Sequence, residues 1–245
     1  DLLHVCFWGE TYQNAFQIPS YKILKEVSSH RWQFDAPYGP LSPQQFVEKF
    51  LAEAKYVAVT SKRLLNLLGP CLPTVEHIAN GISCEQFFLK NTTLSGPMTL
   101  AWAGNAADPI KGVHDILLPA AEGYALALAS GNIAHAELPS FYQDKDIIVV
   151  CSAHEAEPLP LIEAMACGCF PVCTDVGIVS ELVRHKENGY IVLERTVEAF
   201  KEAFTWCSEN IERIRSMRSA LANEVRRQRN WELCAASYRQ AWEYA

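Results

Sequence analysis

The sequence predicts an α/β protein built from two parallel-sheet domains, and three observations support this. From residue 98 onward, short apolar runs of strand length alternate with helical patterns, as in sheets whose parallel strands are joined by helices. The first 90 residues show a weaker version of the same alternation. A polar segment over residues 89–97 ends in turn formers and separates the two parts, so we predict a linker there.

The expected elements follow from apolar runs that are bounded by polar or turn-forming residues. In the first part we predict strands over 2–7, 56–60 and 74–78 and helices over 43–54 and 62–68. In the second part we predict strands over 98–103, 124–129, 146–151 and 169–173, and helices over 113–122, 138–142, 159–167 and 180–185. Residues 196–244 carry helical periodicity only, interrupted near Arg229-Asn230.

Length and composition narrow the class of protein. The chain has 245 residues, which is enough for one large domain or two modest ones. Hydrophobic residues make up 49% and charged residues 20%, a composition that excludes disorder for most of the chain. There are 21 Lys and Arg residues against 28 Asp and Glu residues, so the formal net charge is −7. We therefore expect no nucleic-acid partner.

The nine cysteines are an odd number without a paired framework. The spacing of Cys167, Cys169 and Cys173, with Cys151 upstream, suggests a metal site. Cys151 ends an apolar run and the others flank apolar residues, so we interpret all four as buried core side chains. This implies a reducing, cytoplasmic location. No apolar run approaches the roughly 18–20 residues of a membrane span.

One predicted helix can bind an anion at its start. Pro158 and Pro160 fit only the first turn of a helix, which should end at about Cys167 with Gly168 closing it. Its free N–H groups, and its partial positive charge, would hold a diphosphate.

The N–H donors expected at this helix start are those of Leu159, Leu161 and Ile162. Glu155 lies just before the helix and Glu163 lies inside it, where each carboxylate could accept hydrogen bonds from hydroxyl groups attached to the phosphates. The alternative is that Glu155 and Glu157 are ordinary N-terminal helix acids favoured by the dipole, and that Glu163 lies on a solvated face.

The segment around this helix resembles a known family. Glu155, seven further residues and Glu163-Ala164-Met165-Ala166-Cys167-Gly168 are followed by Pro171-Val172, Thr174-Asp175-Val176-Gly177 and Glu181. This ordered pattern is similar to the signature of retaining glycosyltransferases of family 4 (group 1), which have the GT-B fold. The resemblance implies two Rossmann-like domains facing a cleft, of which the N-terminal one is shortened or truncated.

The resemblance also implies domain limits. Residues 1–93 would be the partial acceptor-side domain, and residues 94–230 the donor-binding domain. Residues 231–245 would be a helix that crosses back to the first domain and packs through Trp231, Tyr238 and Trp242.

Further site residues follow from the same resemblance. Gly104 and Asn105 resemble the family's glycine loop, although many members have arginine where this chain has Asn105. Lys111 resembles the phosphate-binding lysine, with a solvated lysine as the alternative. His135 lies where the nucleotide base is expected, or is a plain loop histidine. Cys6 stands where many members have an active-site histidine, so that role is unfilled or is taken by a neighbour.

The implied reaction transfers a sugar from a UDP or GDP sugar to a saccharide, lipid-linked or other acceptor, with retention of configuration. Glu155 would be catalytic, and Glu163, Lys111, Pro158 and the helix start would bind the donor. No metal or cofactor is expected, because no Asp-x-Asp motif ends a predicted strand. The alternative function is a nucleotide-sugar-binding module or subunit that needs a partner chain to supply the missing acceptor half.

A cluster of arginines near the C-terminus suggests a possible peripheral membrane contact, because acidic lipids attract such clusters. A solvated helix face is the alternative. The arginines are Arg213, Arg215, Arg218, Arg226, Arg227 and Arg229.

Overall fold

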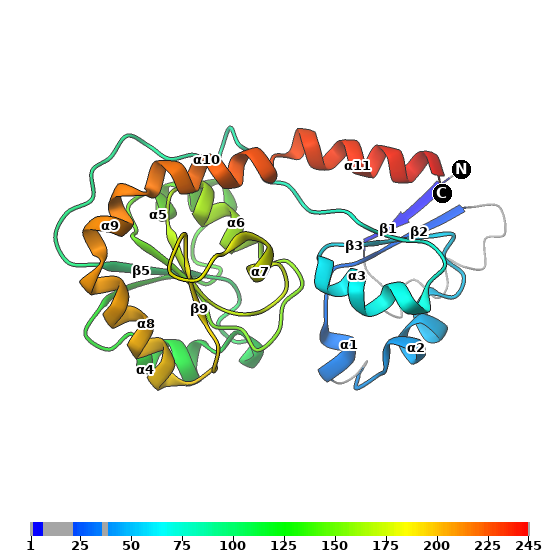
Figure 1. Cartoon of the computed structure of the whole chain (residues 1–245), viewed down its shortest axis with the longest axis horizontal. Helices are drawn as coiled ribbons and strands as arrows, with labels where there is room; N and C mark the ends of the chain where they lie inside the picture. The colour runs from blue at the N-terminus through cyan, green and yellow to red at the C-terminus, as the bar shows by residue number, and fades with distance from the viewer. Residues whose placement is uncertain (1, 7–21, 36–38, 245) are drawn as a thin grey trace. The chain divides into compact units, whose positions relative to one another are not determined.

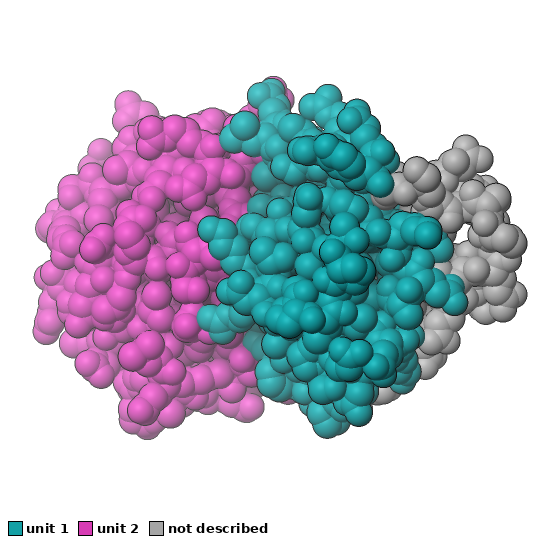
Figure 2. Space-filling model, turned by 45° about the vertical axis from the view of Figure 1, so that its right-hand side comes forward, with its two compact units in different colours: residues 1–81, 154–157, 231–245 teal, residues 82–153, 158–230 magenta. Residues whose placement is uncertain are grey.

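The computed structural model describes residues 2–6, 22–35 and 39–244, and the end of the predicted strand at Phe7 lies outside them. The chain forms two compact units, coloured teal and magenta in Figure 2. Unit 1 consists of Asp1–Gly81, His154–Glu157 and Trp231–Ala245. Unit 2 consists of Ile82–Ala153 and Pro158–Asn230.

Unit 1 contains a four-stranded parallel sheet in the order β1-β2-β3-β4. The strands are β1 (Leu2–Val5), β2 (Lys22–Val27), β3 (Tyr56–Val59) and β4 (Val75–His77). The α-helices are α1 (Arg31–Phe34), α2 (Pro43–Phe46), α3 (Lys62–Leu68) and α11 (Trp231–Tyr244), and a π-helical turn over Val47–Leu51 continues α2. All four side chains of β3 are buried, because both faces of this strand are covered.

Unit 2 contains a five-stranded parallel sheet in the order β6-β5-β7-β8-β9. The strands are β5 (Thr99–Ala103), β6 (Ala125–Ala129), β7 (Ile147–Val150), β8 (Phe170–Thr174) and β9 (Tyr190–Val192). The α-helices are α4 (Leu118–Ala120), α5 (Leu138–Gln143), α6 (Leu159–Ala166), α7 (Val179–Leu182), α8 (Val197–Glu209), α9 (Ile211–Ser216) and α10 (Arg218–Gln228).

The helices of unit 2 cover both faces of its sheet. Figure 1 shows α5, α6 and α10 on one side and α4 and α8 on the other. Along β7, Ile148 and Val150 belong to the core beneath α6 and α10, whereas Ile147 and Val149 belong to the core beneath α8. This alternation is the two-residue period of a strand that is buried on both faces. The predicted α/β class with two parallel-sheet domains is thereby confirmed.

Two strands and one α-helix were not predicted from the sequence, namely β2, β9 and α1. Strand β2 carries charged residues in its interior, which obscured the apolar pattern. Lys25 is only 2% exposed and donates a hydrogen bond to the carbonyl of Phe50. Glu26 is 8% exposed. A buried charge becomes tolerable when a partner is available, and such a partner comes from elsewhere in the fold.

The first unit ends at Gly81, earlier than the expected limit at residue 93. Residues 82–93 belong to unit 2, because Ile82 and Phe87 are buried in its core beside α6 and α10. Residues 89–97 contain no helix or strand, as expected of a connecting segment. Burial of Phe87 in the core of unit 2 therefore places the boundary between the units nearer to the N-terminus than expected.

Helix α11 belongs to unit 1, where its Tyr238 and Ala241 pack in a buried cluster with Leu24 and Tyr56. Trp231 and Trp242, expected to pack as well, are 46% and 44% exposed, although the Trp242 ring contacts Tyr238 and His4. Their helix positions place them beside the stripe that faces the sheet.

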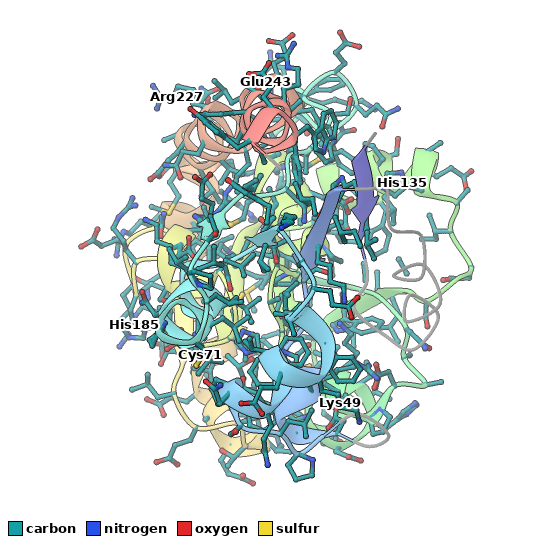
Figure 3. All side chains as sticks on the ribbon, turned by 90° about the vertical axis from the view of Figure 1, so that its right-hand side faces the viewer. Lys49, Cys71, His135, His185, Arg227 and Glu243 are labelled. Atoms are coloured by element: carbon teal, nitrogen blue, oxygen red, sulfur yellow. The ribbon has the colours of Figure 1, made fainter. Side chains whose placement is uncertain are left out.

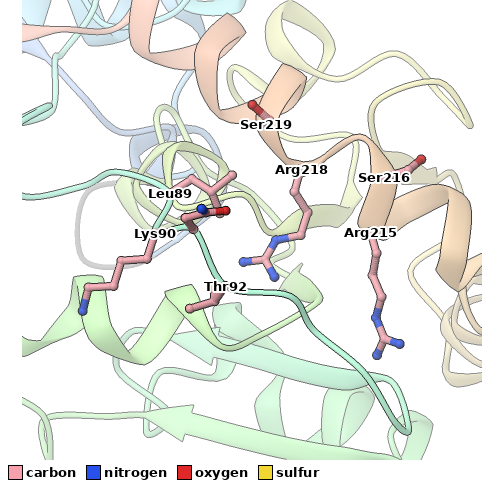
Figure 4. Close-up of a pocket in the computed structure, with 8 residues that line it drawn as sticks. Leu89, Lys90, Thr92, Arg215, Ser216, Arg218 and Ser219 are labelled. Carbon is pink, nitrogen blue, oxygen red and sulfur yellow. The ribbon is translucent and has the colours of Figure 1, made fainter.

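Most of the C-terminal arginines bond to groups within unit 2, so they do not form a continuous solvated helix face. The peripheral membrane contact stays a prediction. The Nε of Arg215 lies 2.9 Å from Oδ1 of the buried Asp146. Arg218 is 5% exposed and donates from Nη2 to the carbonyl of Gln143 at 2.8 Å, and Arg229 is also buried. Figure 4 shows Arg215 and Arg218 projecting from the α9–α10 segment. Within the described residues, no helix is both long enough and apolar enough to cross a bilayer.

Candidate functional site

The sheet of unit 2 has a topological switch point between β5 and β7. The chain passes from β5 to β6 on one side and then to β7 on the other, so the strand order reverses there. In open α/β sheets, ligands bind at the carboxyl ends of the strands at such a point. The loops that begin at Gly104, after β5, and at Cys151, after β7, therefore define the candidate site.

The Gly104–Asn105 loop has the backbone expected of a glycine loop. Gly104 has φ of +148°, and a Cβ there would lie 3.2 Å from the Trp102 ring, so a side chain is disfavoured for two reasons. Its N–H donates to the carbonyl of Ala129 at 3.0 Å. The Oδ1 of Asn105 accepts from the N–H of Ala107 at 3.1 Å and so shapes the turn. Asn105 thus has a structural role at the position where the resemblance would place a cation.

Lys111 lies at the end of a short 3₁₀ turn over Pro109–Lys111, which Asp108 caps by accepting from the N–H of Ile110. The carbonyl of Ile110 accepts from the N–H of Ala153 at 2.8 Å. This bond joins the loop after β5 to the loop after β7, so Lys111 is held at the switch point.

A second cationic side chain, Arg195, lies beside the Lys111–Gly112 turn, and the sequence did not predict it. The Nε of Arg195 donates to the carbonyl of Cys151 at 2.8 Å. A Cβ on Gly112 would lie 2.4 Å from Nη2 of Arg195, so only glycine lets the guanidinium approach. Within the described part of the chain, its Nη groups make no further hydrogen bond. Arg195 thus offers donors beside Lys111, although it lies 84 residues downstream.

Helix α6 has the limits that the prolines and Gly168 predict. It spans Leu159–Ala166 with Pro158 at the N-cap, and Gly168 follows it with φ of +90°. No side chain caps its N-terminus, and Leu159 is 41% exposed there. The expected set of free N–H donors needs one correction. The N–H of Leu161 donates to the carbonyl of Pro158 at 3.0 Å, because the first turn is tightened.

Glu163 lies inside α6 and is 6% exposed. Its Oε1 lies 3.2 Å from Nε2 of His135, and the hydroxyl of Tyr142 donates to its Oε2 at 3.4 Å. Burial raises the pKa of this carboxyl, while His135 and Tyr142 act in the opposite direction. The interpretation of Glu163 as a solvated carboxylate is therefore wrong.

His135, which Figure 3 labels, begins a short turn over His135–Glu137. Its side chain is 67% exposed. The ring of Phe87 meets it edge-on, with centroids 5.6 Å apart. The structure therefore brings His135 and Glu163 together across 28 residues of sequence, with an aromatic side chain beside them. A polar ligand that reached Glu163 would meet His135 first, because the carboxylate is buried and the imidazole is exposed.

Glu155 belongs to a loop, residues 154–157, that is fixed within unit 1 at three of its positions. The Nε2 of His154 lies 3.0 Å from Oδ2 of Asp35. Ala156 is buried in the core beneath α2 and α3. The Nδ2 of Asn80 donates to Oε2 of Glu157 at 2.7 Å. Glu155, half-buried, is therefore carried on a loop with little freedom.

The four clustered cysteines are buried core residues, as predicted. Cys151, Cys167, Cys169 and Cys173 are each 0% exposed, and all nine cysteines are free thiols. Burial raises the pKa of the Cys151 and Cys167 thiols to about 12, so neither is a thiolate at neutral pH. These thiols fill space in the cores on the two faces of the sheet that carries the candidate site.

Comparison with known proteins identifies the fold. The sequence model for "Glycosyl transferases group 1" matches residues 128–227, which include His135 and Glu163. A search of the curated proteins found no match.

Solved structures match over the whole chain. Sucrose-phosphate synthase from Thermosynechococcus elongatus is 20% identical, with a TM-score of 0.82 over 100% of this chain and 74% of that one. Anabaena HepE in complex with UDP is 13% identical, with a TM-score of 0.78 over 100% of this chain and 79% of that one. The catalytic domain of starch synthase IV from Arabidopsis thaliana is 14% identical, with a TM-score of 0.68 over 99% of this chain and 72% of that one.

Two parallel-sheet units that match these structures define the GT-B fold class. The matched region extends from the end of β6 into α10, and it contains His135, Glu163 and Arg195 of the candidate site.

Proposed function

We propose that the protein is a glycosyltransferase of family 4 (group 1) that transfers a sugar from a nucleoside diphosphate sugar, with retention of configuration, to a saccharide or lipid-linked acceptor. The observation that carries the proposal is the switch point of unit 2. At this edge of the sheet lie the cationic side chains Lys111 and Arg195, the Gly104 loop and the N-terminus of α6. The buried carboxylate of Glu163 lies within the same helix. Anabaena HepE, which shares this fold, was solved in complex with UDP, and this supports a uridine donor here.

Each part has a task in that reaction. The transition state resembles an oxocarbenium ion while negative charge grows on the leaving diphosphate. Lys111, Arg195 and the N-terminus of α6 would stabilise that charge, since fixed positive groups act most strongly where charge develops. Glu163 would accept hydrogen bonds from the ribose hydroxyls. Glu155 would orient the sugar near the reacting carbon, and the free cysteines are consistent with a cytoplasmic enzyme.

Substitution of Arg195 tests the cation pair. We expect Arg195→Gln and Lys111→Ala each to weaken binding of UDP or GDP about 10- to 100-fold, because each removes one charge-assisted hydrogen bond. Lys201→Ala, on the exposed face of α8, is the matched control and should leave affinity unchanged. Calorimetric titration at two salt concentrations measures the effect. Unchanged affinity in Arg195→Gln would remove this residue from the donor site.

We also propose that transfer needs no metal at the donor site. The one Asp-x-Asp sequence, Asp144-Lys145-Asp146, precedes β7. Asp146 is occupied, because its Oδ2 accepts from the N–H of Thr99 at 2.9 Å and its Oδ1 from Nε of Arg215. We expect turnover to persist in excess chelator. Complete loss of activity that Mn²⁺ restores would contradict this proposal.

The alternative is a donor-binding module that needs a partner chain, and Cys6 at the place of the expected histidine favours it. Donor hydrolysis and transfer, assayed with this chain alone beside nucleotide binding, separate the two functions. Binding without turnover would support the module.

A further inference from the structure

Three side chains of types that can bind metals, His4, Cys6 and Glu26, lie close together at the carboxyl end of the sheet in unit 1. In the parallel register of β1 and β2, His4 lies opposite Leu24. Alternate residues of a strand share a face, so His4 and Cys6 project on the same side as Glu26. All three belong to unit 1, whereas Lys111 and Glu163 belong to unit 2. This inference therefore goes beyond the proposed function and does not depend on it.

The separations between the ligand atoms suit one small cation. The Nε2 of His4 lies 3.9 Å from Sγ of Cys6 and 3.7 Å from Oε2 of Glu26, and the three ligand atoms lie within 4.8 Å of one another. Tetrahedral zinc, with bonds of about 2.0–2.3 Å, would separate its nitrogen, sulfur and oxygen ligands by roughly 3.4–3.6 Å. Rotamer adjustments of a few tenths of an ångström would close these two gaps to His4. The separation between Sγ of Cys6 and the Glu26 carboxylate, at most 4.8 Å, would have to shorten by up to about 1.2 Å.

The same three side chains border a cavity of about 410 Å³, which Asn80, Trp231 and Trp242 also line. A cation held here would have three protein ligands and an open position toward the cavity. Thiolate, imidazole and carboxylate together select Zn²⁺ or Co²⁺ over Mg²⁺ or Ca²⁺, which prefer oxygen ligands. We propose that His4, Cys6 and Glu26 form a binding site for a zinc-like divalent cation.

Two neighbouring side chains affect metal binding in opposite directions: Tyr238 favours it through Glu26, and Trp242 opposes it through His4. The hydroxyl of Tyr238 donates to Oε2 of Glu26 at 2.9 Å and so orients the carboxylate. The Nε1 of Trp242 lies 3.3 Å from Nδ1 of His4, which must accept this hydrogen bond. An imidazole that binds metal through Nε2 carries its proton on Nδ1, so the indole N–H must turn away. The half-exposed Trp242 has room to do so.

Titration of the reduced, metal-free chain with Co²⁺ tests the site, because a cobalt–thiolate bond gives a charge-transfer absorption band. We expect one equivalent of Co²⁺ to produce the band and Zn²⁺ to displace it. Cys6→Ser should abolish the band, and Glu26→Gln should weaken Zn²⁺ binding by more than the roughly 10–100-fold typical of an outer partner. Tyr238→Phe should weaken Zn²⁺ binding about 10-fold, because Tyr238 only orients a ligand and does not itself bind the metal. Trp242→Phe should bind Zn²⁺ as tightly as the parent chain or more tightly.

Cys71→Ser is the matched control, because Cys71 is another accessible thiol of unit 1 that lies outside the cluster. Far-ultraviolet circular dichroism checks that each variant is folded. Absence of the band at saturating Co²⁺, or a band of equal strength in Cys6→Ser, would overturn the proposal, and so would unchanged Zn²⁺ affinity in Glu26→Gln. Because none of these measurements uses donor or turnover, failure here leaves the glycosyltransferase proposal standing.

Discussion

Replacing Glu155 with glutamine is expected to lower kcat about 10²- to 10³-fold, the loss that follows removal of one group that stabilises a transition state. Nucleotide affinity should hardly change, because the proposed phosphate contacts of Lys111, Arg195 and the α6 N-terminus remain. The measurement is turnover of UDP and GDP sugars beside calorimetric titration of the nucleotide. A fall in kcat without a change in affinity indicates a group that acts on the reacting sugar.

Glu122→Gln is the matched control, since Glu122 is an exposed carboxylate in the turn between α4 and β6. It should match the parent chain in both measurements. If Glu155→Gln loses nucleotide affinity while Glu163→Gln keeps it, the two roles are reversed.

Glu163→Gln is expected to weaken nucleotide binding and to stabilise the fold. The ionised carboxylate accepts stronger hydrogen bonds than an amide, so nucleotide affinity should fall about 10- to 100-fold. Burial raises the pKa of Glu163, which means that its charged form costs folding free energy. Glutamine has no such cost, so the melting temperature at neutral pH should rise. Calorimetric titration and thermal unfolding measure the two effects.

The pH dependence of this variant has a fixed sign. A carboxyl whose pKa is raised in the folded state binds its proton more tightly there, so it contributes stability at low pH that is lost as pH rises through that pKa. The stability difference between Glu163→Gln and the parent chain should therefore shrink in acid. Nucleotide affinity of the parent chain should also begin to fall at a higher pH than an ordinary glutamate would give. A Glu163→Gln variant that is destabilised at neutral pH would contradict this account.

Local sequence determined the element that organises the site. Pro158 and Pro160 restrict the start of α6 and Gly168 permits its end, because proline lacks an N–H and glycine tolerates positive φ. The alternation of apolar runs likewise predicted four of the five strands of unit 2. The apolar pattern did not predict β2, because this strand buries the charged residues Lys25 and Glu26. Phe50 and Tyr238 supply their hydrogen-bond partners.

The sequence by itself determined the α/β fold class and the limits of α6, because backbone preferences and apolar periodicity act over a few residues. The proposed roles of Gly104 and Lys111 rest on the family resemblance. Only the tertiary structure decided which charges meet. It placed His135 against Glu163, Arg195 against the Lys111–Gly112 corner, and Glu26 beside His4. The reason is physical: polar contacts between distant residues depend on the crossing of whole strands and helices, which no local pattern records. The strand order β6-β5-β7 creates the switch point, and with it the proposed site.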